Sequence, residues 1–241
     1  MEKTLSVVMP VYNEQPTLAT IIDKVLAVPF VKELIIVNDC STDQSADILD
    51  SYRHIPSIKV IHHPHNRGKG AAIRTGIAHI TGQVTIIQDA DLEYDPQDYA
   101  KLIQPILAGQ QRVVYGSRFL SVHLNKQKNA VIVDRPNLFW AMLGIITTIV
   151  STIIRNKLRS NQIEQPHAVF FLGGVVVTLI TNTLYGQRLT DEPTCYKTFE
   201  SALLKSIDLQ CERFEFCPEV TAKVARCGIK IMEIPIRYYP R

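Results

Sequence analysis

Residues 84–91 read VTIIQDAD, and this stretch contains both a strand signal and a chemical signal. The run VTIIQ is short and mostly apolar, which predicts a buried strand. Two carboxylates, Asp89 and Asp91, follow directly and are separated by one alanine. Carboxylates at a strand end can share a hard cation such as Mg²⁺ or Mn²⁺, and that ion in turn neutralises a diphosphate. The simpler alternative is a polar turn that leads into the next helix.

Further β-rich runs in the first half of the chain predict a sheet around this strand. They lie at residues 5–11, 33–37, 58–61 and 112–115. Helical patterns separate them, near residues 16–28, 43–52, 68–80 and 96–108. This alternation predicts an α/β fold with a mostly parallel sheet and helices on both faces. Ligands bind at the carboxyl ends of the strands in such sheets.

The length of 241 residues allows one well-buried α/β domain with an appendage. Hydrophobic residues make up 46% and charged residues 20%, which excludes a disordered chain. A net charge of +3 suits contact with phosphates or an anionic membrane, and nucleic acid is not an expected partner. Five cysteines without a C-x-x-C pair predict reduced thiols, and no cleavable apolar leader precedes the first strand. The catalytic part is therefore expected to face the cytosol.

The middle of the chain carries two uncharged segments, residues 138–154 and 168–187. Each predicts a helix with a narrow polar seam and a broad apolar remainder. Their length favours membrane contact over a pair of buried core helices. The loop between them carries Arg155, Lys157 and Arg159 against Glu164, which opposes two crossings. We therefore expect helices embedded in, or lying along, the cytosolic leaflet, as a peripheral or monotopic attachment.

Two further strand ends carry polar residues. Asp39 follows the strand at 33–37 and is a candidate acceptor for hydrogen bonds from a nucleobase or ribose. Tyr12 and Glu14 follow the first strand, where Tyr12 could stack on a base and Glu14 could contact the ribose or base. The absence of a glycine-rich turn here disfavours NAD binding and sugar-nucleotide pyrophosphorylases.

Residues 66–70, NRGKG, open a predicted helix, where free N–H groups and Lys69 could face phosphate. A plain solvated loop is the alternative, because the P-loop spacing is incomplete. Arg118 follows the fifth strand and could hold an acceptor phosphate or balance the acids. The cluster of His62, His63 and His65 favours a loop over a metal site.

Taken together, these segments resemble family 2 glycosyltransferases of the polyprenyl-phosphate type, the group that includes dolichol-phosphate mannosyltransferase. The matching stretches are SVVMPVYNE, VNDCSTD, NRGKGAAIRTGI, QDADLEYDP, VVYGSRF, LTDEPTCYKTF and RFEFCPEVTAKVARCGIKIMEIPIRYYP. They cover nearly the whole chain outside residues 121–188. The resemblance implies the GT-A fold, a nucleotide-sugar donor with UDP or GDP, and a polyprenyl-phosphate acceptor.

The resemblance also implies roles for particular residues. The nucleoside would be bound by Pro10, Tyr12, Glu14 and Asp39. The divalent metal would be held by Asp89 and Asp91, with Glu93 as a further candidate ligand because mannosyltransferases often have glutamine there. Arg118 would meet the acceptor phosphate, and Lys197 of the CYK triplet would pair with the diphosphate.

The expected reaction is in-line displacement at the anomeric carbon, with inversion. The metal and Lys197 would stabilise the leaving diphosphate. A lipid phosphate is already ionised at neutral pH, so it needs alignment more than a strong base. Asp191, in LTDEPT, is the candidate base or positioning group, unless it only braces the following loop.

We expect a nucleotide-sugar-binding half at residues 1–120, an apolar helical insert at 121–187 and an acceptor-side half at 188–241. In the last part, residues 199–207 and 218–227 look helical and 230–236 alternates as a strand. Two other functions stay open. One is a glycosyltransferase with a saccharide or other acceptor in cell-envelope polysaccharide synthesis, although the chain lacks the Q-x-x-R-W element of processive synthases. The other is a catalytically silent, membrane-associated relative, which the early end at Arg241 favours and the intact acids oppose.

Overall fold

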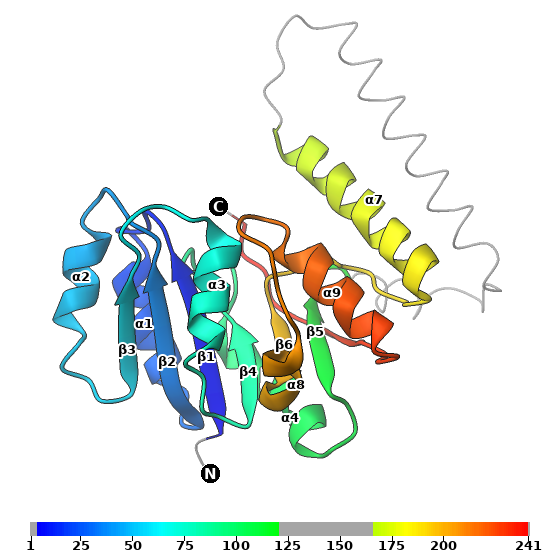
Figure 1. Ribbon diagram of the computed structural model, residues 1–241, viewed down its shortest axis with the longest axis horizontal. Coiled ribbons are helices and arrows are strands. Elements are labelled where there is room, and N and C mark those ends of the chain that lie inside the picture. Colours follow the sequence, from blue (N-terminus) through cyan, green and yellow to red (C-terminus); the bar gives the residue numbers. More distant parts are fainter. Residues whose placement is uncertain (1–3, 121–165, 241) are drawn as a thin grey trace, which may run out of the picture.

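A mixed seven-stranded sheet lies at the centre of the computed structural model, which describes residues 4–120 and 166–240. The strand order is β3-β2-β1-β4-β6-β5-β7 (Figure 1). The strands are β1 (Leu5–Val11), β2 (Val31–Asn38), β3 (Ile58–His62), β4 (Val84–Ile87), β5 (Val113–Ser117), β6 (Lys197–Glu200) and β7 (Met232–Pro235). The pairs β1–β2, β1–β4, β2–β3 and β5–β7 are parallel, whereas β6 runs antiparallel to β4 and β5. The predicted mostly parallel α/β sheet is therefore confirmed.

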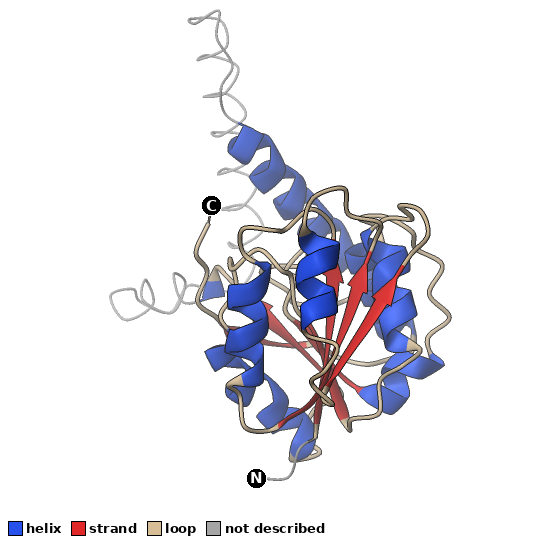
Figure 2. Ribbon diagram, turned by 90° about the vertical axis from the view of Figure 1, so that its left-hand side faces the viewer, coloured by secondary structure: helices blue, strands red, loops and turns tan. Residues whose placement is uncertain are grey.

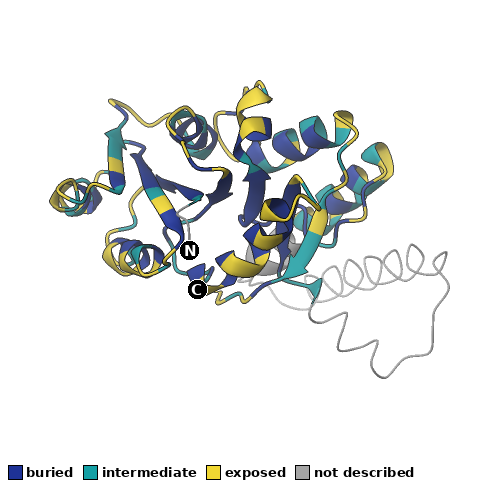
Figure 3. Ribbon diagram, turned by 90° about the horizontal axis from the view of Figure 1, so that it is seen from below, coloured by how far each residue is buried: buried dark blue, intermediate teal, exposed yellow. Residues whose placement is uncertain are grey.

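Helices cover both faces of this sheet (Figure 2). They are α1 (Leu18–Leu26), α2 (Ser45–Ser51), α3 (Lys69–Ile77), η1 (Pro96–Asp98), α4 (Tyr99–Leu107), α8 (Ser201–Ser206) and α9 (Phe216–Arg226), with α7 described below. The buried residues of α1 recur at helical spacing, namely Leu18, Ile21, Ile22 and Val25, so one apolar stripe faces the sheet. Figure 3 shows the buried residues along the strands and the inner sides of the helices. Every residue of β1 is buried, as expected for a strand covered on both faces.

The segment around β6 differs from the predicted helix at 199–207. Lys197–Glu200 forms a strand, and the helix α8 begins only at Ser201. Phe199 is opposite Thr85 of β4 and Val113 of β5, so this strand fills the gap between them. A four-residue strand has too few residues for a clear period, and its pairing partners lie more than eighty residues away in sequence.

Helix α7 (Pro166–Tyr185) projects from the domain and contacts α9 (Figure 1). Its polar seam faces the protein, because Thr178 is buried and Asn182 exchanges two 2.8 Å hydrogen bonds with the backbone of Leu189. Its exposed large apolar residues are Val176, Ile180 and Leu184. The other predicted apolar helix, residues 138–154, lies outside the described residues. Within residues 4–120 and 166–240, no helix has the length and apolar character needed to cross a membrane.

Gly76 sets how closely α3 can approach β1. A Cβ added at Gly76 would lie 2.5 Å from Cγ1 of Val8, well inside van der Waals contact. We predict that Gly76→Ala lowers the free energy of unfolding by about 1–3 kcal/mol, measured by urea denaturation. Gly173→Ala is the matched control, because its Cβ would meet nothing within 4 Å. In a helix interior that change should raise stability by about 0.5–1 kcal/mol, and equal effects at both positions would contradict the packing argument.

Candidate functional site

The carboxyl ends of the parallel strands β1, β2 and β4 meet at one cavity of about 540 Å³. Its walls combine strand ends, the start of α3 and the loop before α9. The lining residues are Pro10, Val11, Tyr12, Glu14, Asp39, Asn66, Gly68, Lys69, Ala72, Asp89, Ala90, Asp91, Arg213 and Phe214. The residues predicted for the nucleoside are all here, together with Lys69, Asp89 and Asp91. Four other predicted site residues are not among the lining residues, namely Glu93, Arg118, Asp191 and Lys197.

Asp39 is buried at the end of β2, and its carboxylate binds the loop between β3 and α3, which forms one wall of the cavity. Its Oδ1 accepts a 2.9 Å hydrogen bond from the N–H of Arg67, and its Oδ2 accepts one of 2.7 Å from Gly68. Oδ1 also lies 2.6 Å from Nδ1 of His63, whose other ring nitrogen contacts Thr75 at 2.9 Å. His63 thus braces this carboxylate. A carboxylate has about four acceptor positions, so these three bonds leave room for one donor from a bound base or ribose.

Two of the N–H groups at the start of α3, which the sequence predicted to be free, are already hydrogen-bonded. The N–H of Gly70 donates to the carbonyl of Arg213 at 2.8 Å, and that of Ala71 donates to Glu212 at 2.9 Å. Gly68 has a φ of +93°, and a Cβ there would lie 2.4 Å from the carbonyl oxygen of Glu212. The loop before α9 is therefore docked on the helix and uses the groups that a phosphate would need.

This docking brings two residues to the cavity that sequence reasoning had not singled out, Arg213 and Phe214. The Phe214 side chain is 83% exposed at the cavity. Both lie in the stretch RFEF, but their place depends on hydrogen bonds to residues more than 140 positions earlier. No local pattern in the sequence reports such a contact.

Lys69 lies against the predicted metal ligands. Its Nζ is 2.6 Å from Oδ1 and 2.8 Å from Oδ2 of Asp89. Burial disfavours the charge of Lys69, but the Asp89 carboxylate outweighs burial and raises the pKa of the ammonium. Asp91 Oδ1 accepts a 3.1 Å hydrogen bond from the N–H of Glu93, and the Glu93 carboxylate accepts one of 3.0 Å from the hydroxyl of Tyr238.

The three acids therefore do not converge on one point. Within the described ranges, no three His, Cys, Asp or Glu side chains form a group that could hold a metal ion. Asp89 and Asp91 still fit a divalent cation as two hard oxygen ligands on a cavity wall, because Mg²⁺ and Mn²⁺ commonly take their other ligands from water and substrate phosphates.

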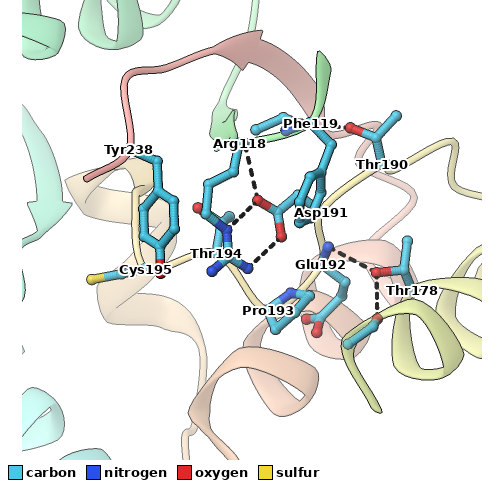
Figure 4. A network of polar contacts seen from close by, with 12 residues as sticks. Arg118, Phe119, Thr178, Thr190, Asp191, Glu192, Pro193, Thr194, Cys195 and Tyr238 are labelled. Carbon is cyan, nitrogen blue, oxygen red and sulfur yellow. Dashed lines mark hydrogen bonds and ion pairs between the residues drawn. The ribbon is translucent and has the colours of Figure 1, made fainter. Parts of the chain in front are cut away.

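Arg118 and Asp191 form a second polar cluster (Figure 4). The Asp191 carboxylate accepts hydrogen bonds from Nε at 2.8 Å, Nη2 at 2.7 Å and the backbone N–H of Arg118 at 3.0 Å. Burial disfavours the Arg118 charge, but the bonds to Asp191 outweigh it and raise the pKa of the guanidinium. Asp191 is fully buried, and Arg118 contacts both of its carboxylate oxygens. This geometry favours the positioning role of Asp191 over the base role.

Lys197 is fully buried and does not reach the cavity. Its Nζ donates to the carbonyl of Glu192 at 2.5 Å and lies 3.7 Å from Glu192 Oε1. The ring centroid of Tyr115 is also 3.7 Å from this nitrogen. The Lys197 charge faces the core in this structure, which does not favour the expected contact with a diphosphate.

Comparison with known proteins gives the family and the fold. The model of the family described as Glycosyl transferase family 2 matches residues 6–172. Dolichyl-phosphate beta-glucosyltransferase ALG5A of Trichomonas vaginalis is 27% identical over 97% of this chain and 65% of its own length. Undecaprenyl-phosphate 4-deoxy-4-formamido-L-arabinose transferase of Edwardsiella ictaluri is 36% identical over 42% of this chain and 33% of its own length. The chain thus spans less than two thirds of these relatives.

A solved structure shares the fold. Glucosyl-3-phosphoglycerate synthase from Mycobacterium tuberculosis, in complex with Mn²⁺, UDP and glucosyl-3-phosphoglycerate, superposes with a TM-score of 0.60 at 18% identity. The match covers 99% of this chain and 73% of that one. The predicted GT-A-like arrangement is confirmed by this likeness.

Glu219 of α9 anchors the docked loop and should make it sensitive to acid. Its carboxylate accepts hydrogen bonds from the N–H groups of Gln210 and Cys211 at 2.8 and 2.7 Å. Burial opposes the charge, but bonds from Lys223 and these N–H groups outweigh it and lower the pKa of Glu219 from 4.5 to about 2. Because the pKa of Glu219 is lowered on folding, its ionised carboxylate stabilises the folded state. This stabilisation is complete above pH 4.5 and is lost as the pH falls towards 2.

We therefore predict that Glu219→Gln reduces stability near neutral pH and that its difference from the wild type shrinks between pH 4.5 and 2. Urea denaturation across this pH range measures the difference in the free energy of unfolding. Glu212→Gln, which removes an exposed carboxylate from the same loop, is the control. A constant difference between Glu219→Gln and the wild type over the whole range would refute the anchor.

Proposed function

The chain belongs to glycosyl transferase family 2, and from this premise we propose that it transfers a sugar, with inversion, from a UDP- or GDP-sugar to a polyprenyl phosphate. The observation that carries the proposal is that polar residues from three parallel strand ends line one cavity together with Lys69. The relatives named as dolichyl-phosphate and undecaprenyl-phosphate sugar transferases support the acceptor class.

The donor would lie in this cavity. Tyr12, Glu14 and Asp39, with Pro10, would bind the nucleoside. Asp89 and Asp91 would hold Mg²⁺ or Mn²⁺, which when bound supplies positive charge against the diphosphate. Lys69 and Arg213 line the same cavity, so we assign them to the diphosphate in place of the buried Lys197.

The acceptor would meet Arg118. A phosphate oxygen forms the new bond to the anomeric carbon while the bond from that carbon to the donor diphosphate breaks. An ionised phosphate needs no proton removed, which agrees with the absence of a free base at Asp191 in the described cluster. Asp191 instead fixes the guanidinium, whose planar donors suit a phosphate.

A lipid acceptor places the enzyme at a membrane, and we propose peripheral or monotopic attachment to the cytosolic leaflet. Val176, Ile180 and Leu184 support this, because they form an exposed apolar stripe on α7. We further propose that residues 1–120 bind the donor, 121–187 form the insert and 188–241 complete the acceptor side. The ion pair of Arg118 with Asp191 joins the first part to the third.

We predict that Asp91→Asn abolishes the Mn²⁺-dependent part of donor binding. A thermal-shift panel of UDP- and GDP-sugars, with and without Mn²⁺, measures this, because a ligand that binds the folded state raises its apparent stability. Asp47→Asn, an exposed acid in the first turn of α2, is the control. An unchanged Mn²⁺-dependent shift in Asp91→Asn would remove the metal assignment. Transfer to undecaprenyl or dolichyl phosphate, compared with saccharide acceptors, then tests the reaction, and a wild type without transfer would favour the silent relative.

Two lysine variants separate the donor contact from the core contact. Lys69→Met should weaken donor binding roughly tenfold or more while leaving the fold intact, since a charge-assisted hydrogen bond is lost. Lys197→Met should instead lower the free energy of unfolding by about 3–5 kcal/mol, because Glu192 would stay buried without its partner. Isothermal titration calorimetry with UDP and Mn²⁺, beside urea denaturation, measures both. The reverse outcome would return the diphosphate contact to Lys197.

A further inference from the structure

Residues 237–239, near the end of the chain, lie against residues 93–98, which follow Asp89 and Asp91. Tyr238 forms an antiparallel bridge with Tyr94, and the N–H of Tyr239 donates to the carbonyl of Glu93 at 2.9 Å. One residue earlier, the backbone N–H and the guanidinium of Arg237 both donate to the Asp98 carboxylate, at 2.7 to 3.0 Å. The backbone on both sides of Tyr238 is therefore fixed by contacts that do not involve its side chain.

The side chain of Tyr238 touches two groups that the proposed function uses. Its hydroxyl donates a 3.0 Å hydrogen bond to Oε2 of Glu93, two residues after Asp91. The centroid of its ring lies 5.1 Å from Cζ of Arg118, and Figure 4 shows the ring beside the guanidinium.

Arg118 is held from more than one direction. Asp191 takes the edge formed by Nε and Nη2, while the rings of Tyr238 and Phe119 lie 5.1 and 5.4 Å from Cζ. Among these contacts, the ion pair leaves Nη1 for a second anion. A guanidinium held at one edge and stacked on a ring has few other orientations, so the direction of its remaining donors is set before the acceptor arrives.

We propose that Tyr238 is a positioning residue of the transfer reaction: its ring orients Arg118 toward the acceptor phosphate, and its hydroxyl ties Arg118 to the segment that carries Asp91. This inference rests on the proposed function, in which Arg118 binds the acceptor. The ring and the hydroxyl have separate tasks, which makes the assignment open to a two-variant test.

Tyr238→Phe keeps the ring and removes the hydroxyl, whereas Tyr238→Leu removes both. Steady-state transfer would be measured with farnesyl phosphate as a short polyprenyl phosphate, Mn²⁺, and the nucleotide sugar that gives the largest thermal shift. At saturating Mn²⁺ we expect the acceptor KM of Tyr238→Leu to rise about tenfold with the donor KM unchanged, as for the loss of a desolvated cation–π contact. Tyr238→Phe should keep the acceptor KM within about twofold of the wild type, because the ring contact with Arg118 is retained.

A second measurement tests the role of the Tyr238 hydroxyl. Calorimetric titration of Mn²⁺ in the presence of UDP should show weaker binding in Tyr238→Phe by roughly threefold to tenfold, since the tether on Glu93 is one hydrogen bond. Tyr239→Phe is the matched control, because the same atom is removed from the neighbouring, half-exposed tyrosine. Melting temperatures of all variants separate these effects from a loss of fold.

The possible results separate a failure of the proposed function from a failure of the role proposed for Tyr238. If the wild type transfers no sugar to farnesyl phosphate or to a longer polyprenyl phosphate, the proposed function fails and the role of Tyr238 fails with it. If the wild type is active and Tyr238→Leu keeps its acceptor KM, only the role of the ring is overturned. An equal rise of the acceptor KM in Tyr238→Phe and Tyr238→Leu would also overturn the proposed role of the ring. An unchanged Mn²⁺ affinity in Tyr238→Phe would overturn the proposed role of the hydroxyl.

Discussion

The carboxylate of Asp39 is buried at the end of β2 and accepts hydrogen bonds from the N–H groups of Arg67 and Gly68. Removing this carboxylate would leave two part-buried N–H donors without their partner, which lowers stability. These bonds fix the turn before α3, and that turn brings Lys69 against Asp89. They also place the start of α3 where the carbonyls of residues 212 and 213 can accept its N–H groups. Much of the cavity thus depends on one buried acid.

The charges of the site are organised as two ion pairs. Lys69 lies on Asp89 inside the cavity, and Arg118 lies on Asp191 beside it. In each pair the hydrogen bonds to the carboxylate restrict the orientation of the cation. A donor diphosphate and an acceptor phosphate would each find a cation whose position is already set. Under the proposed function, the two anionic substrates would therefore have separate places, one at each ion pair.

Helix α7 also contacts the loop of this cluster. Thr178 accepts a hydrogen bond from the N–H of Glu192, in the loop that carries Asp191 (Figure 4). Asn182 holds Leu189 in the same loop. The polar seam of the helix is therefore used against the protein, and the apolar residues are left outside. The loop that carries Asp191 is thus held from this side by α7.

Local sequence patterns were enough to predict the alternation of strands and helices, and with it the sheet edge at which Tyr12, Asp39, Asp89 and Asp91 meet. Parallel strands bring their carboxyl ends together wherever they occur, so local patterns were sufficient for that part of the site. Which charged side chains pair with each other depends on the folded chain. The partners Arg118 and Asp191 are separated by 73 positions, and Glu93 and Tyr238 by 145. Lys197 was directed into the core because the reversed strand β6 packs between β4 and β5. Such pairings come from burial and from hydrogen bonds between distant segments, which leave no periodic trace in the chain.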